Sequence, residues 1–159
     1  MAGAWTLVAL LGAGGKGLQE RRSIARDLHE MGIGALIPED DLPEGLAPSL
    51  LERHFLSTED VDLIFVDVQS WGSAAEFTEL RSDSRASPKL RVLVGRRHHP
   101  IYGSSSSGYL SDTYMTHEAV FGHVYMYRDG KDDPDWLPTS NEIALRIAER
   151  YKQWKALSS

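Results

Sequence analysis

The residues best suited to chemistry lie in the segment 69–76, which reads Gln-Ser-Trp-Gly-Ser-Ala-Ala-Glu. This segment follows the apolar run 63–66, and its Ser and Gly residues are typical of a turn before a helix. The spacing predicts that Glu76 lies in the first turn of that helix, where the helix dipole favours an ionised carboxylate. Glu76 is therefore the residue of this segment to consider for chemistry, although a carboxylate in a first turn can also serve only to complement the helix dipole.

A second candidate segment is the glycine-rich turn 12–17, which reads Gly-Ala-Gly-Gly-Lys-Gly. Its glycines fit the pattern G-x-G-x-x-G, which lets a phosphate approach the backbone and the amides that open a helix. An acidic residue at Glu39 or Asp40 also suits the ribose-binding position of a dinucleotide fold. A tight strand-to-helix turn without a ligand gives the same pattern, so both interpretations stay open.

These segments belong to an alternation of strands and helices. Apolar runs predict five strands, at 5–11, 35–38, 63–66, 90–94 and 120–127. Helical spacing predicts helices after the glycine turn, over 48–56, after the segment 69–76, and from the capping box Thr139–Glu142 onward. The polar stretch 97–116 has no clear period and predicts a long loop.

This alternation predicts one α/β domain over residues 1–159. We expect a three-layer αβα sandwich around a five-stranded parallel sheet, doubly wound as in flavodoxin-like or Rossmann-like folds, with strand order 2-1-3-4-5. In such sheets ligands bind at the carboxyl ends of the strands, where the winding reverses. The loops after the first and third strands should therefore meet and form the site, with Asp67 at the end of the third strand.

Composition narrows the functional classes. The chain is 42% hydrophobic and 25% charged, which is typical of a globular domain. It has no cysteine, which excludes thiolate chemistry and favours the cytoplasm. The net charge of −6 argues against a nucleic-acid groove, and the apolar run 5–11 is too short to span a membrane. The histidines at 98, 99, 117 and 123 lack the spacing of a metal site, so we expect no metal.

Together with the glycine turn, the pattern Ser70-x-Gly72-x-x-x-Glu76 resembles the nucleoside 2-deoxyribosyltransferase superfamily, including its 2′-deoxynucleoside 5′-phosphate N-glycosidase branch. The resemblance covers roughly the first half of the chain. It implies cleavage or transfer of an N-glycosidic bond, with Glu76 as the nucleophile. It also implies a small nucleoside or nucleotide as substrate, no cofactor, and a homo-oligomer. The substrate-binding residues that we expect are Gly12, Gly14, Gly15, Lys16, Asp67, Ser70, Trp71 and Gly72.

Several assignments stay open within this resemblance. The family has a second acid where this chain has His54, and Glu52, Asp60, Asp67 or His54 itself are the alternatives. The cation that holds a phosphate is Lys16, Arg21 or Arg22, and Tyr102, Tyr109 or Tyr114 could stack on a base. Ala74 stands where the family has a second glycine, and the sequence after the fourth strand departs from the family.

Other functions compete with N-glycosidic chemistry. They are a nucleotide-binding sensor without turnover, an NAD hydrolase of the Toll/interleukin-receptor type, a dinucleotide-dependent oxidoreductase, and a purely structural interaction module. The NAD hydrolase is included because Trp71 before a helical Glu bears some resemblance to that type.

Overall fold

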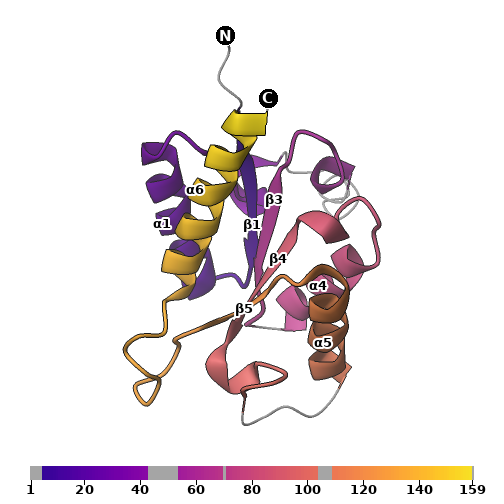
Figure 1. Ribbon diagram of the computed structural model, residues 1–159, viewed down its shortest axis with the longest axis vertical. Helices are drawn as coiled ribbons and strands as arrows, with labels where there is room; N and C mark the ends of the chain where they lie inside the picture. Colours follow the sequence, from indigo (N-terminus) through magenta and orange to yellow (C-terminus); the bar gives the residue numbers. More distant parts are fainter. Residues whose placement is uncertain (1–4, 43–53, 70, 104–108, 159) are drawn as a thin grey trace.

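The computed structural model describes residues 5–42, 54–69, 71–103 and 109–158, and its centre is one parallel sheet (Figure 1). The strand order is β2-β1-β3-β4-β5, and every neighbouring pair runs parallel, which confirms the predicted doubly wound order. The strands are β1 (Leu7–Gly12), β2 (Gly34–Leu36), β3 (Leu63–Asp67), β4 (Leu90–Gly95) and β5 (Val124–Tyr127).

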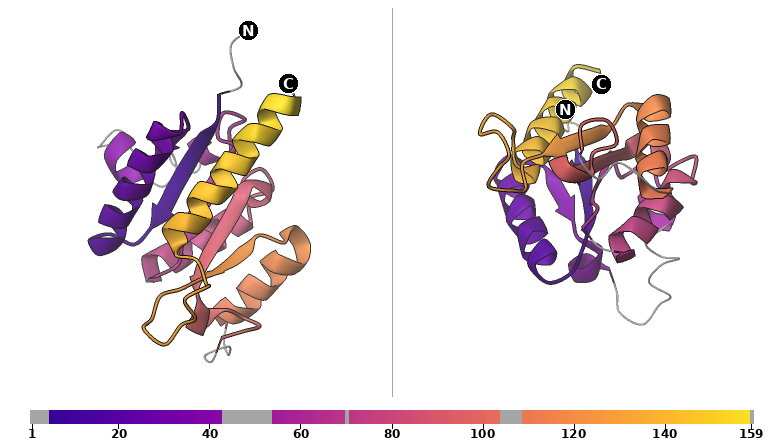
Figure 2. Two further views of the ribbon diagram at one scale, coloured as in Figure 1. Left: turned by 60° about the vertical axis from the view of Figure 1, so that its left-hand side comes forward. Right: turned by 90° about the horizontal axis from the view of Figure 1, so that it is seen from below.

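Helices cover both faces of this sheet, as the predicted three-layer sandwich requires (Figure 2). On one face lie α1 (Lys16–Glu30) and α6 (Ser140–Ser158), and on the other lie α4 (Trp71–Arg81) and α5 (Tyr109–Phe121). Shorter elements connect them: α2 (Pro38–Asp41) follows β2, and the 3-10 helices η1 (Ser87–Lys89) and η2 (Arg96–His98) flank β4.

Each face of the sheet has its own apolar core. Val8 and Leu10 of β1 pack with α1 and α6, whereas Ala9 and Leu11 pack with α4 and α5. Side chains alternate across a strand, so a strand buried on both faces must be apolar at nearly every position. This is why the central strands read as unbroken apolar runs.

The second half of the chain differs from the sequence-based expectation. The stretch predicted to be a loop, 97–116, contains the first eight residues of α5, and β5 begins at Val124 rather than at 120. The inward face of α5 is formed by Thr113, Tyr114 and His117, which are all buried. These residues have helical spacing, but two of them are polar in type, so a search for apolar periodicity overlooks the helix.

Two smaller differences concern β2 and the helix predicted at 48–56. Pro38 was expected to end the second strand, but it opens α2 instead, because proline lacks the N–H that a sheet needs and fits the first turn of a helix. Residues 54–56 are helical, while the rest of the predicted helix lies outside the described residues.

Candidate functional site

The glycine turn and the end of β3 lie side by side at the carboxyl edge of the sheet. β1 pairs with β3 so that Gly12 is opposite Asp67. A Cβ atom at Gly12 would lie 3.2 Å from the backbone oxygen of Asp67, so glycine here allows the two strand ends to approach closely. The winding of the sheet reverses between these strands, as predicted, and this edge is where doubly wound folds bind ligands.

The tip of the turn is open. Gly14, Gly15 and Lys16 are exposed, and a Cβ built at Gly14 or Gly15 would meet no atom of the described residues within 4 Å, apart from its own chain neighbours. Gly15 has a φ of 60°, which glycine adopts without strain, and it stands immediately before the first residue of α1. Within the described part of the chain no side chain caps this helix end, so its backbone amides could bind an anion.

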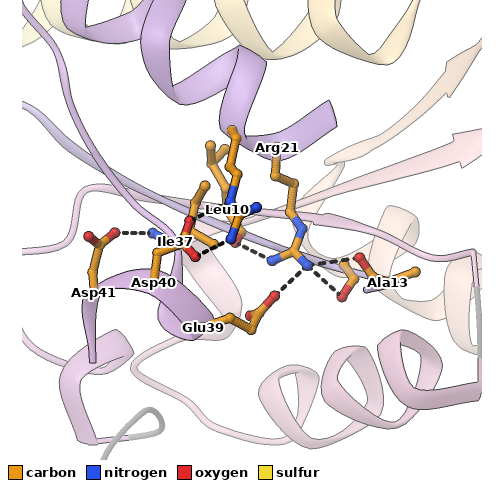
Figure 3. Close-up of polar contacts among 9 residues, drawn as sticks. Leu10, Ala13, Arg21, Ile37, Glu39, Asp40 and Asp41 are labelled. Carbon is orange, nitrogen blue, oxygen red and sulfur yellow. Dashed lines mark hydrogen bonds and ion pairs between the residues drawn. The ribbon is translucent and has the colours of Figure 1, made fainter. Parts of the chain in front are cut away.

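Arg21 of α1 forms hydrogen bonds with the backbone of the glycine turn (Figure 3). Its guanidinium group donates to the carbonyl oxygens of Leu10, Gly12 and Ala13, at 3.3, 3.2 and 2.8 Å. It also forms an ion pair with Glu39 at 2.5 Å. With a buried side chain so fully engaged, Arg21 is a structural support of the turn, and most of its donors are committed to the protein itself.

Most of the other charged candidates near the turn are also engaged in ion pairs. Arg22 forms a two-pronged pair with Asp40 of α2, at 2.9 and 2.7 Å. Glu39 and Asp40, the candidate ribose acids, are therefore both engaged with arginines of α1. Lys16 remains as the cation that is exposed at the mouth of the turn.

Asp67 is the acidic group of this edge. Its carboxylate accepts hydrogen bonds from the Tyr127 hydroxyl at 2.8 Å and from Gln69 Nε2 at 2.9 Å. Burial raises the pKa of Asp67 to about 6, the negative charges of Glu20 and Asp129 add to the rise, and the two hydrogen bonds oppose it. A carboxyl group with this pKa can both hold and release a proton near neutral pH.

Glu76 lies farther along its helix than predicted. The helix α4 begins at Trp71 and has no acidic residue in its first turn, so the prediction that the dipole of this turn stabilises the Glu76 carboxylate is wrong. Glu76 is the sixth residue of α4, and its side chain is half-buried, with Oε2 shielded from solvent. Of the neighbouring candidates, Ser70 lies outside the described residues, and Trp71 and Gly72 are described only as part of the helical backbone.

Two hollows adjoin the glycine turn on the side of α1 and α6. An inner hollow reaches the sheet, and an outer hollow opens between the start of α1, the end of β5 and the start of α6. Polar or glycine residues of the inner hollow are Gly12, Gly17, Glu20, Arg21, Asp67, Gln69 and Ser140. Polar residues of the outer hollow are Lys16, Glu20, Ser23, Gln69, Tyr127, Arg128, Asp129, Thr139, Ser140 and Asn141.

Most polar residues of these hollows were not among the predicted binding residues, and Glu20, Gln69, Tyr127 and Asn141 are examples. Gln69 is the first residue of the candidate segment 69–76, although no binding role was predicted for it. Tyr127 and Asn141 lie sixty or more residues from Asp67, and only the pairing of β4 with β5 brings their part of the chain to this edge. No pattern in the sequence indicates that proximity.

Several other candidates lie away from the hollows. Tyr114 is buried and stacks on Phe77 with ring centres 5.3 Å apart, which makes it a core residue. Tyr102 stacks on His99 at 5.1 Å. His54 and Asp60 precede β3 and so lie toward the opposite edge of the sheet, whereas Glu52 is outside the described residues. Of the described alternatives for the second acid, Asp67 is therefore the one at the carboxyl edge of the sheet, beside the glycine turn.

Within the described ranges, no three His, Asp or Glu side chains gather as a metal site would require. No helix in the same ranges is long and apolar enough to cross a membrane. A scan against protein-family models gave no match, and a search of curated proteins found no significant relative.

Proposed function

We propose that the protein binds a nucleoside or nucleotide at the carboxyl edge of the sheet and cleaves or transfers its N-glycosidic bond. The observation that carries the proposal is the proximity of the open glycine turn and the Asp67 carboxyl group at the point where the winding reverses. Helix α4, which carries Glu76, starts four residues after Asp67. Turn, acid and candidate nucleophile are thus supplied by adjacent connections.

The proposed reaction has two steps. The Glu76 carboxylate attacks the anomeric carbon, the bond from that carbon to the base nitrogen breaks, and a glycosyl ester forms. The departing base takes a proton, which Asp67 can donate because its pKa of about 6 leaves part of the population protonated. Water or a second base then attacks the anomeric carbon and gives its proton to the Asp67 carboxylate, while the ester bond to Glu76 breaks and restores the free carboxylate.

The environment of Glu76 supports this role. Its half-buried side chain keeps one carboxylate oxygen out of water, and desolvation strengthens the electrostatic interaction of a carboxylate with a developing positive charge. Its neighbour Glu79 is exposed on the same helix. The two glutamates therefore form a matched pair for testing.

The test is to incubate the protein with nucleosides, nucleotides, deoxynucleotides and NAD, and to follow free base by chromatography. For a substrate that the wild type cleaves, Glu76→Gln should lower the rate by at least about a thousandfold, because a carboxamide is a poor nucleophile. The control Glu79→Gln should keep the wild-type rate. If Glu76→Gln retained full activity, this mechanism would be wrong.

Binding without turnover is the second candidate function. It is favoured by one observation: Glu76 is not among the described residues that line the two hollows beside the glycine turn. A nucleotide held there by Lys16 and Asp67 would then lie beyond the reach of Glu76. Calorimetry that shows nucleotide binding, together with no release of base, would favour this function over the enzymatic one.

Two further proposals concern the oligomeric state of the protein and its cellular compartment. The resemblance stated above suggests a homo-oligomer, which light scattering would measure directly. The absence of cysteine from the sequence favours a reducing compartment such as the cytoplasm.

A further inference from the structure

A closed set of hydrogen bonds surrounds the carboxylate of Asp67. The Tyr127 hydroxyl donates to Asp67 Oδ1 at 2.8 Å, and Gln69 Nε2 donates to Asp67 Oδ2 at 2.9 Å. Gln69 Nε2 also donates to the Tyr127 hydroxyl oxygen at 3.3 Å. Each oxygen of the carboxylate thus has its own donor, and the two donor groups are bonded to each other.

The two donor groups differ in their freedom to move. Tyr127 is the last residue of β5, is only 6% exposed, and belongs to the apolar core on the side of α1 and α6. Gln69 follows β3, is exposed, and borders both hollows beside the glycine turn. The hydroxyl group on Oδ1 is therefore fixed by packing, whereas the carboxamide on Oδ2 can turn.

This difference determines which oxygen of Asp67 carries a proton. A proton on Oδ1 would make that oxygen a donor toward Tyr127 and leave the tyrosine hydrogen without an acceptor. If Gln69 turned to accept that hydrogen, its own oxygen would lie against Asp67 Oδ2, and two acceptors would face each other. A proton on Oδ2 requires only that Gln69 turn, because its Oε1 then accepts from Oδ2 while Tyr127 keeps its bond to Oδ1.

We propose that Tyr127 is a positioning residue for the acid of the N-glycosidic reaction: its hydroxyl occupies Oδ1 of Asp67 and so keeps the transferable proton on Oδ2. This role rests on the proposed function, whereas the position of the proton can be measured without a substrate. In the reaction, Oδ2 gives its proton to the nitrogen of the departing base and later takes one from the attacking water. Gln69 accepts from Oδ2 in the protonated state and donates to it in the ionised state.

The titratable groups that surround Asp67 come from several elements. They are Glu20 and Arg21 of α1, Tyr114 of α5, Tyr127 of β5, and Asp129 after β5. The negative charges of Glu20 and Asp129 disfavour ionisation of Asp67, whereas the hydrogen bond from Tyr127 stabilises the ionised form. Removing the Tyr127 hydroxyl should therefore raise the pKa of Asp67.

The test is an NMR titration of the full chain, read from the side-chain carboxyl carbon of Asp67, whose signal is identified by its loss in Asp67→Asn. In the wild type this carbon should titrate near the pKa of about 6 that burial gives Asp67. Tyr127→Phe keeps the aromatic ring in the core but removes the donor to Oδ1. We expect it to raise the midpoint by at least about one pH unit, because the ionised carboxylate loses a hydrogen bond.

The matched control is Tyr125→Phe. Tyr125 lies on the same strand and packs against the same core, but its hydroxyl oxygen lies 3.2 Å from His123 Nδ1. The Asp67 midpoint should keep its wild-type value in this variant. In the wild type, the side-chain amide signals of Gln69 should shift with the same midpoint as Asp67, because the carboxamide turns when Oδ2 takes up its proton.

The outcomes distinguish this role from the proposed function. An unchanged Asp67 midpoint in Tyr127→Phe would overturn the role of Tyr127, and Gln69 amide signals that do not titrate would overturn the proton position on Oδ2. For a substrate that the wild type cleaves, the rate should fall as the pH rises through the pKa of Asp67, and Tyr127→Phe should move this fall upward by the NMR shift. An NMR shift without a matching shift in the pH profile would refute the part of Tyr127 in the reaction. Failure to release base from any nucleotide would refute the proposed function alone.

Discussion

Asp67 makes the stability of the folded protein depend on pH. Because burial raises its pKa from the ordinary 3.8 to about 6, the folded protein holds this proton more tightly than the unfolded chain does. The resulting stabilisation is present in full below about pH 4 and is lost as the pH rises through about 6. Above that pH, the folded state carries a buried charge at a cost in free energy.

Asp67→Asn removes this dependence, because the amide stays neutral while its oxygen still accepts from Tyr127. We expect the variant to exceed the wild type in unfolding free energy by up to about 3 kcal/mol at pH 8, and by much less at pH 4.5. Urea denaturation at both pH values measures this, with the exposed Asp132→Asn as control. An equal difference at the two pH values would contradict the role of burial.

At the scale of single residues, the sequence indicated those site residues that follow directly from a strand end or a glycine turn. Gly14, Gly15, Lys16 and Asp67 were predicted for the site, and they do lie at the mouth of the crevice or in its hollows. The hydrogen bond from Tyr127 to Asp67 joins residues 60 positions apart. Such a contact depends on strand order and register, which residue types alone do not reveal.

Among the elements, α1 depends on Arg21 for its attachment to the end of β1. The Arg21 guanidinium satisfies three backbone carbonyls and neutralises Glu39. Arg21→Met keeps the apolar stem but leaves these groups without their donor, and we expect it to lower the unfolding free energy by about 2–4 kcal/mol.

The neighbouring Arg22 provides the matched control for this experiment. Its pair with Asp40 is solvent-exposed, so Arg22→Met should unfold close to the wild-type denaturant concentration. Both variants can be compared by urea denaturation with fluorescence detection. Similar losses in the two variants would show that the contacts of Arg21 with the turn contribute little.

Element prediction succeeded for the buried strands and failed for α5. The runs at β1, β3 and β4 are apolar because helices cover both of their faces, and this leaves a plain signal. In α5 the buried side includes His117, whose Nε2 lies 3.3 Å from the Leu90 carbonyl oxygen. A helix that buries polar residues through specific hydrogen bonds cannot be recognised from hydrophobicity alone.

At the scale of the whole molecule, an ion pair fastens the last helix to the beginning of the sheet. Lys155 Nζ lies 2.8 Å from Asp62 Oδ1, and the same Asp62 carboxylate accepts from Leu7 N–H at 2.9 Å. Lys155 also donates to the carbonyl of Trp5 at 2.5 Å. The contact thus joins three segments that are distant in the sequence.

Lys155→Met should weaken this fastening. The mostly buried Asp62 side chain would lose its counter-ion, and we expect a loss of about 1–3 kcal/mol in unfolding free energy. Hydrogen exchange should show the loss as faster exchange at the end of α6 and at Leu7. The exposed Arg150→Met, on the same helix, is the control. Unchanged exchange at both places would contradict the proposed fastening.

The same contact indicates where a label or a solid support can be attached to the protein. Trp5 and the last turn of α6 meet beyond the amino ends of the strands, whereas the glycine turn opens at their carboxyl ends (Figure 1). A fluorophore, an affinity handle or a solid support attached through either end of the described chain would therefore face away from the crevice. Surface-immobilised protein should accordingly titrate with small molecules as freely as protein in solution.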